Sequence, residues 1–175
     1  MKSKYVILAS ALLISVSSFA QKDQIKAAEK ALKNGNTAEA LATLKQAEAT
    51  IGAATEAEKA QYYFVKGNSH ADLANKKMEI TKNNVEAGKA YQQVLAIEKA
   101  SGKSKYSADA QIGLSKIKDD LLNAAQIEAK KETKEGSLNA ANLLYASYEL
   151  DKTNMQNLYY AASYYMNAED YDKAL

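Results

Sequence analysis

The chain has 175 residues, 47% of them hydrophobic, and it contains no proline, tryptophan or cysteine. This length suits one domain or a short array of repeats. Without cysteine the chain has no disulfide, thiolate metal site, thiol nucleophile or lipid attached through an N-terminal cysteine. All its basic residues are lysine, which makes nucleic acid a poor candidate partner because bidentate arginine contacts to bases and phosphates are missing.

Residues 1–20 have the pattern of an export signal. Two lysines precede an apolar segment, and the small residues Ser18 and Ala20 lie three and one positions before an expected cleavage site, between Ala20 and Gln21. The apolar segment is shorter than the roughly 20 residues of a membrane-spanning helix. We therefore expect an exported, periplasmic or secreted, protein with no stable membrane span. Loss of both lysines would leave 21 basic and 21 acidic residues, a neutral mature chain.

The remainder of the chain is predicted to be helical, with no strand. Apolar residues recur at helical spacing, and Gly, Asn or Ser residues separate the periodic segments. We expect helices over about 21–34, 36–51, 56–77, from Asn83 or Asn84 to about 100, 106–131, 138–148, 158–166 and from 171 onward. Three helix starts have a predicted cap: Asn36 with Glu39, Thr55 with Glu58, and Asn154.

The last helix pair has an ordered pattern of large, small and aromatic residues. Its first helix has a large apolar residue, a small one and an aromatic one, at Leu158, Ala162 and Tyr165. A polar turn at Asp170 follows, and the second helix then has an aromatic residue and an alanine, at Tyr171 and Ala174. This pattern resembles the tetratricopeptide repeat family, whose period is 34 residues, the separation of Ala140 from Ala174. Residues 33–51 are similar to the second helix of such a repeat. Weaker matches lie at Tyr63, Gly67, Ala87, Tyr91 and Val94.

The resemblance implies an all-α fold in which antiparallel helix pairs stack as a right-handed superhelix. Residues 21–175 would hold about 3.5 helix pairs. Since the chain stops just inside its last helix, we expect a truncated array. Tyr165 and Tyr171 would pack between helices, and Tyr159 and Tyr160 are left open between packing and binding.

In this family the first helix of each pair lines a concave groove, where a partner binds. The matching positions are Phe64 and Asn68 in the second unit and Tyr159, Ser163 and Asn167 in the last. Some members clamp a terminal carboxylate with lysine and asparagine. Asn68 matches that asparagine, but Phe64 occupies the place of the lysine, so a complete clamp is not expected.

We therefore expect a non-catalytic scaffold of the cell envelope that binds a protein or peptide. The alternative is a small-molecule or glycan carrier that uses the tyrosine-rich helices. No catalytic residue, metal or cofactor is expected: His70 is the single histidine, and phosphate-binding loops and nucleophile elbows are missing. The carboxylate pairs Asp119–Asp120 and Glu169–Asp170 point to different helix faces, so a glycosidase has no positive support.

Overall fold

The computed structural model describes residues 21–174, and every regular element in that range is a helix. The first helix is described over residues 21–33. It is followed by α2 (Thr37–Glu48), the short 3-10 helix η1 (Ile51–Ala53), α3 (Glu56–Asn75), α4 (Ile80–Ser101), α5 (Ser107–Ala129), α6 (Lys134–Leu150), α7 (Met155–Asn167) and α8 (Tyr171–Ala174). The all-α prediction is confirmed. The predicted export signal lies outside the described residues.

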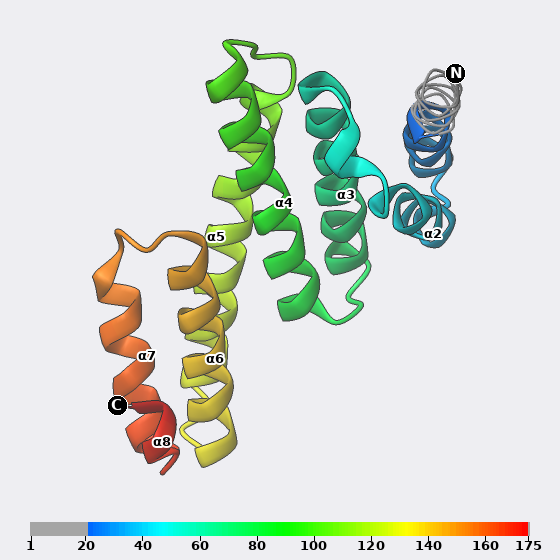
Figure 1. The fold of residues 1–175 in the computed structure, drawn as a ribbon. Helices are drawn as coiled ribbons and strands as arrows, with labels where there is room; N and C mark the ends of the chain where they lie inside the picture. The colour runs from blue at the N-terminus through cyan, green and yellow to red at the C-terminus, as the bar shows by residue number, and fades with distance from the viewer. Residues whose placement is uncertain (1–20, 175) are drawn as a thin grey trace, which may run out of the picture.

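The helices form a row in which each packs chiefly on the next in sequence. The most extensive contacts join α3 to α4, α4 to α5, α5 to α6 and α6 to α7, and smaller contacts join α3 to α5 and α4 to α6. Figure 1 shows the chain advancing from the first helix and α2 on one side to α7 and α8 on the other. Between residues 21 and 174, no helix is both long and apolar enough to cross a membrane.

Two clusters of buried apolar residues hold the row together. The smaller joins the first helix, α2 and α3 through Ile25, Ala28, Leu44, Ala47, Tyr62 and Val65. The larger runs from α4 to α7 and includes Tyr91, Leu114, Leu121, Leu144 and Tyr165. Tyr63 of α3 packs against both clusters. Because many of the buried residues are alanine, the helices approach closely and the cores are thin.

Only one predicted capping box forms. The Thr55 side chain accepts a hydrogen bond from the Glu58 backbone N–H, and the Glu58 carboxylate accepts one from the Thr55 N–H, which satisfies two free donors of α3. Asn36 and Asn154 occupy the N-cap positions of α2 and α7, but neither side chain accepts a capping hydrogen bond. The predicted side-chain caps at these two residues are therefore wrong.

The start of α4 differs from the prediction. The helix begins at Ile80, after Glu79 with a left-handed φ of 38°, and not at Asn83 or Asn84. Asn83 is buried and serves a tertiary role: its Nδ2 donates to the Met78 carbonyl oxygen at 2.7 Å, and its Oδ1 lies 2.8 Å from His70 Nδ1. Asn83, which the sequence suggests as a helix cap, thus stabilises the turn before α4 by a hydrogen bond from its side chain.

Glu98 joins α4 to α5 as a buried carboxylate with 2% exposure. It accepts hydrogen bonds from the backbone N–H groups of Tyr106 and Ser107 and from the Ser107 hydroxyl, at 2.6 to 3.0 Å. Burial alone would raise its pKa, but these hydrogen bonds outweigh burial and hold the pKa of Glu98 below its usual value. Glu98 thereby caps the N-terminus of α5 from the preceding helix.

Candidate functional site

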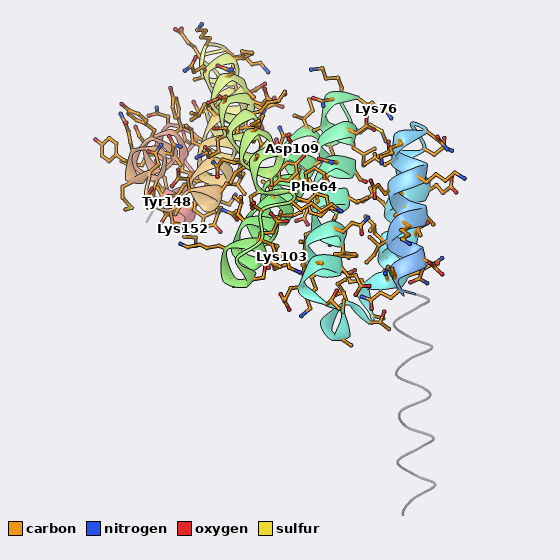
Figure 2. The ribbon with its side chains drawn as sticks, turned by 90° about the horizontal axis from the view of Figure 1, so that it is seen from above. Phe64, Lys76, Lys103, Asp109, Tyr148 and Lys152 are labelled. Atoms are coloured by element: carbon orange, nitrogen blue, oxygen red, sulfur yellow. The ribbon has the colours of Figure 1, made fainter. Side chains whose placement is uncertain are left out.

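Phe64 and Asn68, the groove residues predicted on α3, are engaged in packing between helices. The Phe64 ring is half-buried and stacks on Tyr106, which precedes α5, with ring centroids 4.7 Å apart. Asn68 Oδ1 accepts a hydrogen bond of 2.7 Å from the Tyr91 hydroxyl of α4. Figure 2 shows Phe64 among the side chains in the middle of the row. Both residues therefore have structural partners within the chain.

Tyr91 lies between two glycines, and this is why α3, α4 and α5 pack so closely. A Cβ atom on Gly67 of α3 would lie 2.7 Å from one edge of the Tyr91 ring, and a Cβ on Gly113 of α5 would lie 2.6 Å from the other edge. No larger residue fits at either position without a shift of the ring. Tyr91 is 4% exposed, and burial raises its pKa to about 12.

The predicted residues on α7 lie at the surface. Tyr159 is 72% exposed, and Ser163 and Asn167 are also exposed. Their four-residue spacing places them along one face of the helix. In Figure 1, α4, α5 and α6 lie between α3 and α7. The structure thus does not bring the α3 residues and the α7 residues into a single site.

A first hollow, of about 490 Å³, lies on the α8 side of α7. We call it the outer hollow; its lining includes Tyr145 of α6, Met155, Leu158, Tyr159 and Tyr165 of α7, and Lys173 of α8. Tyr165 is buried, as predicted, and its hydroxyl donates to Asn142 Oδ1 at 2.8 Å. Tyr171 is 60% exposed, so the prediction that it packs between helices is wrong in this structure. The short α8 leaves its ring uncovered.

A second hollow, of about 380 Å³, lies between α5 and α7, with α6 at its base. We call it the inner hollow; it is lined by Leu122, Ala125, Gln126, Leu144, Asn154, Gln156, Asn157, Tyr160 and Tyr164. None of these side chains carries a charge at neutral pH. Amide groups and tyrosine rings dominate the lining, which therefore offers hydrogen bonds in both directions beside apolar ring faces.

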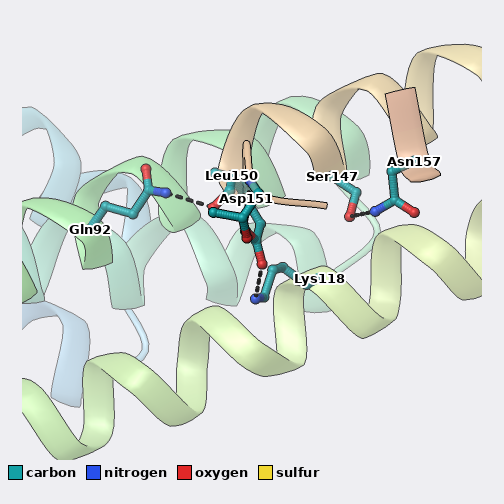
Figure 3. A network of polar contacts seen from close by, with 7 residues as sticks. Gln92, Lys118, Ser147, Leu150, Asp151 and Asn157 are labelled. Atoms are coloured by element: carbon teal, nitrogen blue, oxygen red, sulfur yellow. Dashed lines mark hydrogen bonds and ion pairs between the residues drawn. The ribbon is translucent and has the colours of Figure 1, made fainter. Parts of the chain in front are cut away.

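Polar contacts fix the α6–α7 turn against α4 and α5 (Figure 3). Gln92 of α4 donates to the Leu150 carbonyl oxygen at 2.7 Å, and Lys118 of α5 lies 3.0 Å from the Asp151 carboxylate. Hydrogen bonds from Thr153 and Lys118 lower the pKa of Asp151. Asn157 Nδ2 donates to Ser147 Oγ at 3.1 Å. These contacts fix the N-terminal end of α7, which borders both hollows.

The chain matches no protein-family model, no curated protein and no solved structure.

The residues considered for catalysis make contacts within the chain. Within residues 21–174, no three His, Asp or Glu residues gather where they could hold a metal ion. His70 is half-buried and contacts Asn83, a pairing that links α3 to α4. Asp120 forms an exposed ion pair with Lys116, and Glu169 one with Lys134. Asp170 pairs with Lys173, so three of the four carboxylates considered from the sequence are paired with lysines.

Sequence analysis missed the inner hollow. The groove positions implied by the repeat pattern lie on α3 and α7, and none lies on α5, which lines one side of this hollow. One available signal was the line of Gln156, Tyr160 and Tyr164 at four-residue spacing, which places these side chains along one face of α7. Leu122 and Gln126 of α5 could not be joined to them without knowing that α5 and α7 lie beside the same helix.

Proposed function

We propose that this chain is an exported helical-repeat scaffold of the tetratricopeptide type, which binds a protein partner in the cell envelope and catalyses no reaction. The outer hollow, with the exposed ridge of Tyr159, Ser163 and Asn167 beside it, is the proposed binding surface. The observation that carries the proposal is the concentration of exposed tyrosine and methionine on α6, α7 and α8.

A contact between neighbouring helices recurs along the row. Tyr91 donates its hydroxyl to Asn68, and Tyr165 donates to Asn142, with the partners 23 positions apart in each case. Buried asparagine and alanine residues recur at the same offsets before each tyrosine, namely Asn83 and Ala87, and Asn157 and Ala161. The contact joins α3 to α4, which form one predicted pair, but it joins α6 to α7, which belong to successive pairs. It supports a chain that stacks similar helices side by side, and it does not carry the two-helix period of the proposed repeat.

The exposed side chains on the last helices support a protein interface. Exposed large apolar residues here are Tyr145, Met155, Tyr159, Met166 and Tyr171, whereas the exposed Tyr160 lines the inner hollow. Tyrosine and methionine are enriched in protein interfaces, and tyrosine buries a large area at a small cost in side-chain entropy. An apolar patch of this kind on a helical protein is typical of a binding surface. The Lys173 side chain beside it is already paired with Asp170 at 3.0 Å, so the proposed interface is chiefly apolar.

The test is a site-specific crosslink followed by measured affinities. A photoreactive phenylalanine analogue at position 159, in the natural cells, should give one discrete crosslinked product. The same analogue at position 112, an exposed isoleucine on α5, should not give that product. The crosslinked protein is then purified, and its affinity for the wild-type chain is measured by calorimetry.

We expect Tyr159→Ala to weaken this affinity at least about tenfold, which corresponds to about 1.4 kcal/mol of binding free energy. Ile112→Ala, which removes an equally exposed apolar side chain elsewhere, should leave the affinity unchanged. Equal affinities for wild type and Tyr159→Ala, with helical circular dichroism preserved, would reject the outer hollow as the binding surface.

The lining of the inner hollow favours a second candidate, a carrier of neutral sugars. Tyrosine rings can stack on the apolar face of a sugar, and amides can pair with its hydroxyl groups. Asn157 is 6% exposed and uses its Nδ2 on Ser147, which leaves its Oδ1 free to accept from a ligand. Titration with neutral oligosaccharides should then change the tyrosine fluorescence of the wild type but not of Tyr160→Ala. No response to any tested sugar would remove this candidate.

A further inference from the structure

One face of α4 has a counterpart on α7. Three buried residues of α4 recur on α7 after 74 positions: Asn83, Ala87 and Tyr91 match Asn157, Ala161 and Tyr165. The hydrogen bond to asparagine also recurs with each tyrosine. Gly88 and Ala162, which directly follow the two alanines, are a further matching pair of small residues. The two helices can therefore be compared position by position.

On α4 this face is covered by the two helices that follow it in the chain. Gly113 of α5 lies against the Tyr91 ring. Leu150, the last residue of α6, lies against Gly88, where a Cβ atom would be only 2.6 Å from both Leu150 Cδ atoms. Leu150 is 3% exposed and belongs to the larger core cluster. This face of α4 is thus a docking surface for apolar side chains from neighbouring helices.

On α7 the same face lines the outer hollow. Ala162, at the position of Gly88, borders the hollow together with Leu158. The next difference is in coverage: Val85 of α4 is partly buried against the core, whereas Tyr159, its match on α7, is 72% exposed. The outer hollow is therefore the place on α7 that neighbouring helices fill on α4.

The hollow is continuous with the apolar interface that joins the helices. Ala161 and Tyr165 line it and also belong to the larger core cluster, and Ala174, another lining residue, packs against that cluster. Among its described lining residues, Lys173 alone is charged, and Asp170 already pairs with it. An occupant therefore needs no opposite charge, and the apolar stripe of an amphipathic helix matches this surface.

We propose that the outer hollow binds an amphipathic α-helix of the partner protein, which lies along α7 as α5 lies along α4. Its apolar stripe faces Leu158 and Ala162, and one leucine-sized side chain enters beside Ala162, as Leu150 does beside Gly88. Because Ala162 has a Cβ atom that Gly88 lacks, this side chain lies further from the helix axis than Leu150 does. The inference rests on the proposed function and specifies the structural element that the partner presents.

The probe is a peptide with the sequence of α5, residues 107–129, because this helix already packs on the matching face of α4. A hydrocarbon staple on its solvent-exposed side keeps the isolated peptide helical, since short helices are only marginally stable in water. Fluorescence anisotropy of the labelled peptide measures its affinity for the purified chain. A stapled peptide with the same residues in scrambled order, which lacks the apolar stripe, is the peptide control.

We expect saturable binding of the α5 peptide and none of the scrambled peptide. Ala162→Leu, which fills the hollow, should weaken binding at least about tenfold. Tyr159→Ala, which removes an exposed ring and leaves the core intact, should weaken it too. Ala42→Leu, the same change at an exposed position of α2, is the matched control and should leave the affinity unchanged. Circular dichroism checks that each variant keeps its helices.

Two results would overturn the inference: no binding of the α5 peptide to the wild-type chain, or an affinity that neither Ala162→Leu nor Tyr159→Ala changes. The crosslink from position 159 tests the partner separately. A discrete crosslinked product without peptide binding would keep the proposed partner and reject the helix, while peptide binding without a crosslinked product would keep the helix site and reject the partner. Sedimentation velocity of the chain alone adds one outcome: a dimer that Ala162→Leu disperses would make a second copy the occupant and overturn the assignment to a partner.

Discussion

Replacement of Gly113 by alanine tests the close packing of α3, α4 and α5 on the Tyr91 ring. The new methyl group would lie 2.6 Å from Tyr91 Cε2 and 2.8 Å from Cζ, well inside van der Waals contact. The ring has no space to retreat, because Gly67 contacts its opposite edge. The backbone of α5 must therefore move away from α4, and the contact between the two helices must open.

The magnitude follows from two opposing effects. Alanine in place of glycine stabilises a helix interior by about 1 kcal/mol. Overpacking a tight core costs about 1–3 kcal/mol, and the cost is expected near the upper value because the ring is held from both sides. We expect Gly113→Ala to lower the free energy of unfolding by about 2 kcal/mol. Gly52→Ala is the matched control, since no atom lies within 4 Å of its Cβ position.

The assay is urea unfolding followed by circular dichroism at 222 nm, with the free energy extrapolated linearly to water. Gly52→Ala should be neutral or slightly more stable than wild type. In a Tyr91→Ala background, where the ring is gone, Gly113→Ala should become neutral or stabilising. A Gly113→Ala single variant as stable as wild type, or one equally destabilised in both backgrounds, would refute the proposed clash.

Three further predictions concern polar contacts between elements. Glu98→Gln should lower the free energy of unfolding by about 1–3 kcal/mol at pH 7, because the cap of α5 loses its carboxylate. Since the pKa of Glu98 is lowered in the folded chain, the carboxylate stabilises the fold above its usual pKa of 4.5, and this stabilisation is lost as the pH falls through the pKa of the folded state. The urea midpoints of wild type and variant should therefore converge in acid. Tyr91→Phe and Tyr165→Phe should each lose about 0.5–1.5 kcal/mol, since each removes one hydrogen bond to asparagine, and a marked inequality would argue against equivalent contacts. Lys118→Met, which breaks the part-exposed pair with Asp151, should change stability by no more than about 1 kcal/mol in thermal unfolding.

The helices and several of their ends could be predicted because they depend on local sequence. The 3.6-residue spacing of apolar residues identifies each helix from residue 21 onward, and the Thr55–Glu58 box is formed by neighbouring residues. The α4 start could not be predicted in the same way. Glu79 adopts a left-handed conformation, and the Asn83 side chain contacts His70 of α3. These tertiary contacts override the local preference of asparagine for the N-cap position.

The contacts of Tyr91 could not be predicted from the repeat pattern. Tyr91 lies on the helix that follows the predicted groove helix α3, and Tyr165 lies on the predicted groove helix α7 itself, yet the two tyrosines have the same hydrogen bond to asparagine and the same burial. Similarly, the Phe64 position suggested a groove, but the ring is covered by Tyr106, a residue far away in the sequence. Which of two helix faces is free depends on the neighbouring helices, and one helix pattern alone does not contain that information.

The division of the core into two clusters has a mechanical consequence. The first helix and α2 are attached to the rest of the chain through one side of α3, and α2 packs on α3 less extensively than α4 does. A force that pulls the two ends of the described chain apart is therefore expected to separate α2 from α3 before it separates α3 from α4. Extension would then begin on the N-terminal side of the row and reach α4 to α8 later.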